Sequence, residues 1–184
     1  MSRVLFVRHC QSNGLPEPDD RLTDLGLVQA SALAEHLRQY QVDRVVCSPY
    51  RRSQQSIEPF IDASGLLLEA DSRLAERRVS PVRFEAEYAR LSFLRKSYAE
   101  PDLRMPGGES AREALERGWS IMLELLRSEA ELVIAVSHGQ LLSQVLARID
   151  PSFGFAGWTA MTNPDVFLVE AQTDGGVAFQ RTWG

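Results

Sequence analysis

A short apolar run near the N-terminus constrains the fold more than any other feature of this sequence. Val4-Leu5-Phe6-Val7 leads directly into Arg8 and His9. A continuous apolar run bounded by polar residues is typical of a strand that is buried on both faces of a parallel sheet. Ligands of such sheets bind at the carboxyl ends of the strands. We therefore expect Arg8 and His9 to lie at a sheet edge that a substrate can reach.

This pair of side chains suits phosphate chemistry. An arginine carries a permanent charge on a planar fork that matches the oxygens of a phosphoryl group. A neutral imidazole beside it can attack phosphorus and form a covalent intermediate. The alternative is that Arg8 and His9 are two solvated residues that follow a strand by chance.

The composition is that of an ordinary globular chain. The sequence has 184 residues, of which 44% are hydrophobic and 24% are charged, and this length fits one domain with a sizeable core. The net charge of −5 provides no general attraction for nucleic acid or for an anionic membrane. Any affinity for an anion therefore depends on where individual arginines lie.

Targeting segments, membrane spans and metal-ligand clusters are not evident in the sequence. No apolar run approaches the roughly 20 residues of a membrane helix, and the N-terminal run is too short for a signal peptide. Only Cys10 and Cys47 are present, which suits a reducing compartment. The two cysteines and three histidines show no metal-ligand spacing. We expect a cytoplasmic protein without a metal or another cofactor.

Apolar runs alternate with amphipathic segments along the chain. Further strands are predicted at residues 42–47, 66–68 and 132–136, and helices at 23–40, 48–65, 110–128 and 140–149. A turn at Asp174-Gly175 between the apolar runs 166–170 and 177–182 predicts an antiparallel hairpin. The expected fold class is α/β, a three-layer α/β/α sandwich with a mainly parallel sheet and an antiparallel edge.

The alternation is interrupted between Asp71 and Gly108. This stretch contains one predicted helix, at 84–98, followed by Pro101, Pro106 and a glycine pair. We interpret residues 77–108 as a small lid over the carboxyl edge of the sheet, inserted in a single domain that spans residues 1–184.

Three predicted strands lead into residues that can bind or transfer a phosphoryl group. Besides Arg8-His9, the strand at 132–136 runs into Ser137-His138, and the strand at 42–47 runs into a segment that contains Arg52. Parallel strands deliver such residues to one edge. Transfer also needs a proton donor for the departing alkoxide, and Glu76 is expected at the same edge.

Several motifs in this order resemble the histidine phosphatase superfamily, also called phosphoglycerate-mutase-like, and its short bacterial members in particular. The matching segments are Arg8-His9 with Cys10 in the glycine position, Leu22-Thr23-Asp24-Leu25-Gly26, Ser48-Pro49-Tyr50-Arg51-Arg52, Leu74-Ala75-Glu76, Pro106-Gly107-Gly108-Glu109-Ser110 and Ser137-His138-Gly139. Each motif is weak alone, and their common order makes the resemblance specific over residues 3–145.

The resemblance implies a role for each residue. His9 would be the nucleophile that becomes phosphohistidine, Glu76 the general acid and then the base for water, and Arg8, Arg52 and His138 would bind phosphoryl oxygens. The substrate is expected to contact Gln11, Ser12, Arg77 and Gly139. The expected activity is metal-independent hydrolysis of a small phosphorylated metabolite.

Three alternatives remain open from the sequence. A cofactor-dependent phosphoglycerate mutase would need a lid that holds a bisphosphate, but this lid is short and Leu15 stands where many mutases have asparagine. A phosphohistidine phosphatase acting on proteins would need an open, shallow pocket. A catalytically silent phosphate-binding module is favoured only by Cys10.

Several polar residues have a structural and a functional interpretation. A solvated helix face is favoured for the basic residues of the lid, with Arg77 and Arg78 as exceptions, and a helix start is favoured for Glu109 and Ser110. His36 is expected at the surface. Cys10 either is a reactive thiolate beside Arg8 and Arg52 or packs as a small apolar residue. A bridge to Cys47 would require Cα atoms within about 7 Å, a distance that the sequence leaves open.

Overall fold

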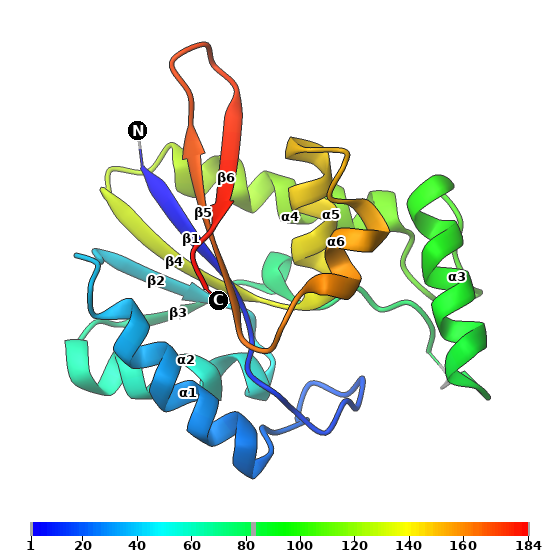
Figure 1. Ribbon diagram of the computed structural model, residues 1–184, viewed down its shortest axis with the longest axis horizontal. Coiled ribbons are helices and arrows are strands. Elements are labelled where there is room, and N and C mark those ends of the chain that lie inside the picture. Colours follow the sequence, from blue (N-terminus) through cyan, green and yellow to red (C-terminus); the bar gives the residue numbers. More distant parts are fainter. Residues whose placement is uncertain (1, 82–83, 184) are drawn as a thin grey trace.

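The computed structural model describes residues 2–81 and 84–183 of the chain (Figure 1). Its elements, in chain order, are β1 (Arg3–Arg8), α1 (Asp24–Leu37), β2 (Arg44–Cys47), α2 (Arg51–Ser64), β3 (Leu68–Ala70), the short 3-10 helix η1 (Ser72–Leu74), α3 (Glu87–Ala99), α4 (Ala111–Leu126), β4 (Leu132–Ser137), α5 (Gly139–Ile149), α6 (Gly154–Ala160), β5 (Asp165–Ala171) and β6 (Val177–Arg181).

The strands form one mixed sheet in the order β3-β2-β4-β1-β5-β6. Strands β1 to β4 pair in parallel, and β5 and β6 add an antiparallel edge. In this register Arg8 lies beside Ser137, and Cys47 lies beside Val136. The segments that follow β1, β2 and β4 therefore meet at one edge, as the sequence predicts.

Helices cover both faces of this sheet, because alternate residues of each strand point to opposite sides. Leu5 and Val7 pack in a core with residues of α1 and α2, whereas Val4 and Phe6 pack in a second core with residues of α4 and α5. Figure 1 shows the two helix pairs on opposite sides of the sheet. The predicted three-layer α/β/α sandwich is confirmed.

Helix α1 ends at Leu37 rather than Tyr40. Its apolar residues divide between core and surface, because Leu33 and Leu37 are buried whereas Leu25 and Val28 are 53% and 67% exposed. At Gly26 the helix approaches the preceding loop closely, because a Cβ atom there would clash with the backbone oxygen of Gln11. The helix therefore packs closely through its small residues.

Helix α2 begins later than predicted, at Arg51. Ser48 still continues the sheet, because its backbone N–H donates to Val136 O (2.9 Å). The helix ends at Gly65, whose left-handed φ of 70° is the conformation in which glycine commonly ends helices. Strand β3 lies at Leu68–Ala70, two residues beyond the predicted run.

The lid helix α3 and the short helix α6 lie side by side beyond the carboxyl edge of the sheet (Figure 1). The rings of Tyr98 and Phe155 join them, with 5.8 Å between centroids. Helix α6 was not predicted. Within residues 2–81 and 84–183, no helix combines the length and apolar character needed to cross a bilayer.

Candidate active site

His9 follows β1 and is 8% exposed. Its Nδ1 atom lies 2.6 Å from Cys10 O, so the neutral ring carries its proton there and leaves the Nε2 lone pair free. Burial lowers the pKa of His9 to about 3, and the positive charge of Arg52 contributes to the shift. His9 is therefore a neutral, oriented imidazole at pH 7, which is the form a nucleophile requires.

Arg8 is fixed by the chain that precedes β5. Its Nη1 atom donates to Met161 O (3.0 Å) and Thr162 O (3.3 Å), whereas its buried Nε has no partner in the described part of the chain. Gly139 approaches this guanidinium closely, because a Cβ atom at Gly139 would lie 3.2 Å from both Arg8 Cζ and Trp158 Nε1. A larger residue at this position would therefore press against the side chains of Arg8 and Trp158.

Arg52, rather than Arg51, lines the cavity from the first turn of α2. Its Nη1 atom donates to Glu17 O (3.0 Å) and lies 4.0 Å from Oδ2 of the fully buried Asp20. The guanidinium also lies 4.8 Å from the centre of the Tyr50 ring. These contacts connect Arg52 to the loop that follows β1.

His138 precedes α5 and is fully buried behind His9, with 5.0 Å between the ring centroids. Its Nε2 atom lies 2.7 Å from Ser48 Oγ and 3.2 Å from Ser53 Oγ. Its Nδ1 atom has no partner among the described residues. Burial, with the positive charge of nearby residues, lowers the pKa of His138 well below its usual range.

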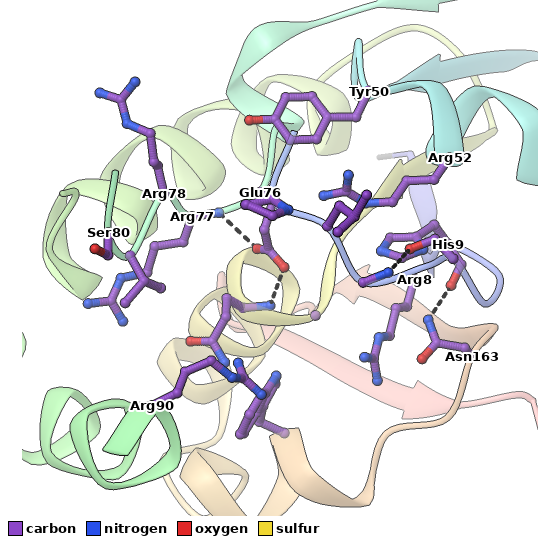
Figure 2. Close-up of a pocket in the computed structure, with 18 of the residues that line it drawn as sticks. Arg8, His9, Tyr50, Arg52, Glu76, Arg77, Arg78, Ser80, Arg90 and Asn163 are labelled. Atoms are coloured by element: carbon purple, nitrogen blue, oxygen red, sulfur yellow. Dashed lines mark hydrogen bonds between the residues drawn. The ribbon is translucent and has the colours of Figure 1, made fainter. Parts of the chain in front are cut away.

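Glu76 lies opposite these residues, at the N-terminus of α5. Its carboxylate accepts hydrogen bonds from the backbone N–H groups of Arg77 (2.8 Å), Leu141 (3.1 Å) and Gln140 (3.2 Å). Figure 2 shows Arg8, His9 and Arg52 on one side of the cavity and Glu76 on the other. The proton donor expected from the sequence therefore faces the predicted nucleophile.

These side chains enclose a cavity of about 440 Å³. The residues that line it include Arg8, His9, Gln11, Ser12, Leu15, Tyr50, Arg52, Glu76, Arg77, Arg78, Arg90, Gly139, Gln140, Trp158 and Asn163. His138 is not one of them, because its ring lies behind the wall. A neutral imidazole, two arginines and a carboxylate can together bind a phosphoryl group and transfer it.

The four predicted substrate contacts differ in what they offer. Ser12 and Gly139 line the cavity, as does Gln11, whose Oε1 accepts a hydrogen bond from Thr23 Oγ1 (2.9 Å). Arg77 is buried and donates to Ser97 Oγ (2.8 Å) and Glu109 O (3.1 Å). These two bonds join the first residue of the lid to α3 and to the residue that follows the lid, and the buried Nη2 atom of Arg77 has no partner among the described residues.

Cys10 packs in the core, so the thiolate interpretation is wrong. Its side chain is fully buried with Leu5 and Val7, and burial raises the pKa of the thiol to about 12. The chain turns after β1, so that His9 reaches the cavity while Cys10 faces the sheet. Cys47 is likewise a buried free thiol.

The basic residues of the lid divide between the cavity and the surface. Arg90 lines the cavity together with Arg77 and Arg78. From the sequence, a position at the cavity was expected for Arg77 and Arg78 but not for Arg90. Arg104 pairs with Glu113 (2.9 Å), and Arg95 lies 4.8 Å from the centre of the Phe155 ring. Arg83 lies outside the described residues.

The other ambiguous polar residues have structural contacts. Ser110 caps α4 in a reciprocal pair with Glu113, and Glu109 forms an ion pair with Arg117 (2.6 Å). His36 is partly exposed beside Tyr40 and Trp183. In the part of the chain that the structure describes, no three potential metal-ligating side chains come together.

Two residues that hold the site residues in position were not predicted from the sequence. Asn163 Nδ2 donates to His9 O (2.7 Å), and Asp20 stands beside Arg52. Asn163 precedes Pro164, and Asp20 lies in a polar loop. The local sequence gives both residues the pattern of ordinary turns, so only the folded chain reveals their contacts.

Comparisons with known proteins identify similar sequences among phosphatases and phosphoglycerate mutases. The family model of the histidine phosphatase superfamily (branch 1) matches residues 4–182. A glucosyl-3-phosphoglycerate phosphatase of Mycobacterium tuberculosis is 28% identical over 182 residues, covering 86% of this chain and 79% of the relative. A 2,3-bisphosphoglycerate-dependent phosphoglycerate mutase of Allorhizobium ampelinum is 31% identical over 173 residues, covering 80% and 79%.

The fold is also similar to solved structures. The mycobacterial glucosyl-3-phosphoglycerate phosphatase in complex with VO3 aligns with a TM-score of 0.80 and 24% identity, covering 100% of this chain and 99% of that chain. The family match spans nearly the whole sequence and overlaps every element from β1 to β6. This chain therefore belongs to the histidine phosphatase superfamily.

Proposed function

We propose that this protein is a phosphatase that hydrolyses small phosphomonoesters through a covalent phosphohistidine at His9. The observation that carries this proposal is the state of His9. Its Nδ1 side is occupied by Cys10 O, its pKa of about 3 keeps the ring neutral, and Arg8 and Arg52 line the same cavity. A neutral Nε2 between two cations suits attack on phosphorus.

The proposed first step transfers the phosphoryl group to the protein. His9 Nε2 forms a bond to phosphorus while the bond from phosphorus to the ester oxygen breaks. Arg8 and Arg52 stabilise the negative charge on the phosphoryl oxygens. His138, which does not line the cavity, packs against the His9 ring and supports its position. Glu76 enters this step as the protonated carboxylic acid, and the departing alkoxide takes its proton.

The second step returns His9 to its starting state. Glu76, now a carboxylate, accepts a proton from a water molecule as that water attacks the phosphohistidine. The bond between nitrogen and phosphorus breaks, and inorganic phosphate leaves. No metal is invoked in either step. Gln11, Ser12 and Gly139 border the substrate in this proposal, and Arg77 contributes through the orientation of the lid.

The same proposal covers the organisation of the chain. Residues 1–184 form one domain, with residues 77–108 as a lid. Two free thiols suit a reducing compartment such as the cytoplasm. The substrate is a small phosphorylated metabolite, as the names of the phosphatase and mutase relatives also favour.

Phosphate release from a panel of sugar phosphates, phosphoglycerates and nucleotides tests the proposal. We expect His9→Ala to remove turnover and His36→Gln to retain it, because His36 packs beside Tyr40 and Trp183 and is not a lining residue of the cavity. A panel in which the wild type releases no phosphate would contradict hydrolysis.

A mutase is the competing function, and Leu15 argues against it. Its apolar side chain lines the cavity and is 45% exposed, so it offers no hydrogen bond to a second phosphate. With 2,3-bisphosphoglycerate present, we expect phosphate release to exceed interconversion of 2- and 3-phosphoglycerate. Interconversion that outpaces release would establish the mutase instead.

A further inference from the structure

The cavity is larger than a phosphoryl group needs. Its volume of about 440 Å³ lies in the range of sites that enclose a whole small molecule. The phosphoryl group contacts only one end of the cavity, which is formed by Arg8, His9, Arg52 and Glu76. The rest of the cavity wall must therefore fit the alcohol part of the substrate.

Much of this remaining wall is apolar and comes from separate segments of the chain. The loop after β1, the segment before α2, the lid and α6 each contribute to it. The apolar lining residues are Leu15, Pro16, Tyr50, Val79, Phe84 and Trp158. We call this group the apolar wall.

Two aromatic rings of the apolar wall are held in place by their neighbours. Tyr50 packs against Arg52 (4.8 Å) and against His138, with 5.0 Å between the ring centroids. Trp158 packs against Phe155 (5.4 Å) and Arg90 (5.9 Å). Tyr50 lines the cavity, and Figure 2 shows its ring above Glu76. These rings offer pre-positioned surfaces to a flat or apolar group.

Two arginines of the lid are engaged by the protein next to this wall. Arg90 donates two short hydrogen bonds to Glu87, of 2.6 and 2.8 Å, and Arg77 is bound to Ser97 and Glu109. Among the described residues, three that line the cavity carry buried polar atoms without a partner, namely Arg8 Nε, Arg77 Nη2 and the Gln140 amide. Two of the three, Arg8 and Gln140, adjoin His9 and Glu76, so most of the free polar atoms lie at the reacting end.

We infer that the preferred substrates are phosphomonoesters whose leaving alcohol carries an aromatic or similarly bulky apolar group, in preference to short hydroxy acids. This inference rests on the proposed phosphatase function. The phosphoryl group binds at His9, and the apolar part of the alcohol covers Leu15, Tyr50 and Trp158. Burial of that surface supplies the selectivity.

Primary alkyl esters test the inference, because their alcohols are similar leaving groups. The comparison uses 2-phenylethyl phosphate, ethyl phosphate and 3-(phosphonooxy)propionate. The last is the phosphate ester of 3-hydroxypropionate and carries a carboxylate in place of the ring. We expect kcat/KM for the phenylethyl ester to exceed both others by about 10- to 100-fold, the range that burial of one ring supplies. Equal values, or preference for the carboxylate ester, would overturn the inference.

A variant at the mouth of the cavity tests whether the apolar wall is responsible. Leu15→Asn removes exposed apolar surface, and we expect it to lower the phenylethyl-to-ethyl ratio of kcat/KM severalfold. Val28→Asn is the matched control, because Val28 is 67% exposed on α1 and does not line the cavity. A ratio that does not change in Leu15→Asn would contradict the role of the wall.

Binding of non-hydrolysable phosphonates separates this inference from the proposed function. Calorimetry should show tighter binding of 2-phenylethylphosphonate than of ethylphosphonate to the wild type. Hydrolysis of all three esters without any such preference would overturn the inference alone. Absence of hydrolysis with the binding preference intact would contradict the phosphatase and support the apolar wall as a binding surface. Absence of both would overturn the two together.

Discussion

Asp20 is the residue that best shows how the site depends on buried support. Its carboxylate is fully buried, 4.0 Å from Arg52, and accepts hydrogen bonds from Leu15 N (3.3 Å) and Asn13 Nδ2 (3.4 Å). A buried carboxylate needs such partners, because desolvation disfavours its charge. Asp20 therefore fixes both the arginine and the loop at the mouth of the cavity.

Asp20→Asn tests this positioning role. Asparagine retains the shape of the side chain and loses the charge, so Arg52 loses its ionic partner. We expect KM and the inhibition constant of inorganic phosphate to rise about tenfold, which corresponds to about 1.4 kcal/mol of binding free energy. The change in kcat should be smaller. Steady-state kinetics measure the split. Asp24→Asn, at an exposed residue of α1, is the control. A fall in kcat alone would argue against a role in binding.

The two buried histidines predict how stability depends on pH. Folding lowers the pKa of His9 to about 3, whereas an unfolded histidine titrates near 6.5. Between these values the unfolded chain binds more protons, so stability falls as pH decreases from about 6.5 towards 3. The contribution of His9 is about 1.4 kcal/mol per pH unit.

Urea unfolding of the wild type and of His9→Gln, between pH 7 and 4, measures this contribution. Glutamine does not titrate, so the variant should lose stability less steeply with decreasing pH. Parallel curves for the two proteins would show that His9 titrates normally in the fold.

Among residues, the sequence indicated His9, Arg8, Arg52, Glu76 and His138 because each follows or adjoins a strand end. The sequence did not predict the direction in which the Cys10 side chain points. Two successive residues leave β1 in different directions, and local sequence does not specify which one faces the core. Asp20 and Asn163 likewise depend on contacts between distant segments.

At the scale of elements, the docking of α1 positions the loop that borders the cavity. Gly26 packs against the backbone of Gln11, and Gln11 N donates to Gln29 Oε1 (2.8 Å). The loop between them carries Leu15 and Asp20. A close contact at the start of α1 therefore sets the position of the cavity mouth.

Gly26→Ala tests that contact. A methyl group would clash with the Gln11 backbone, so we expect a loss of about 1–3 kcal/mol in the free energy of unfolding, together with a higher KM. Ser31→Ala, at an exposed residue of the same helix, should leave stability within about 0.5 kcal/mol. A Gly26 variant as stable as the wild type would show that the loop adapts without cost.

Elements differed in how well the sequence predicted them, and the cause was their environment. The core strands β1 and β4 are buried on both sides and carry unbroken apolar runs. Helix α6 has seven residues, two of them glycine, and no fully buried residue, so neither propensity nor periodicity marks it. Its position depends on packing against α5 and α3.

At the scale of the whole molecule, parallel pairing converts separate strand ends into one site. The order β3-β2-β4-β1 brings the residues after β1, β2 and β4 to one edge, and the lid and α6 close the cavity from outside. The sequence predicts the first part, because buried parallel strands have a clear pattern. It does not predict the lid and α6 walls, which pack through scattered aromatic contacts.

The central claim, a phosphoryl group carried by His9, is tested most directly by trapping the phosphorylated enzyme. Wild-type protein is mixed with radiolabelled phosphomonoester and quenched after a fraction of one turnover, in acid or in alkali. We predict label on the wild type that is lost in acid and retained in alkali, the behaviour of phosphohistidine, and no label on His9→Ala. Label that survives acid, or that remains on His9→Ala, would contradict the account.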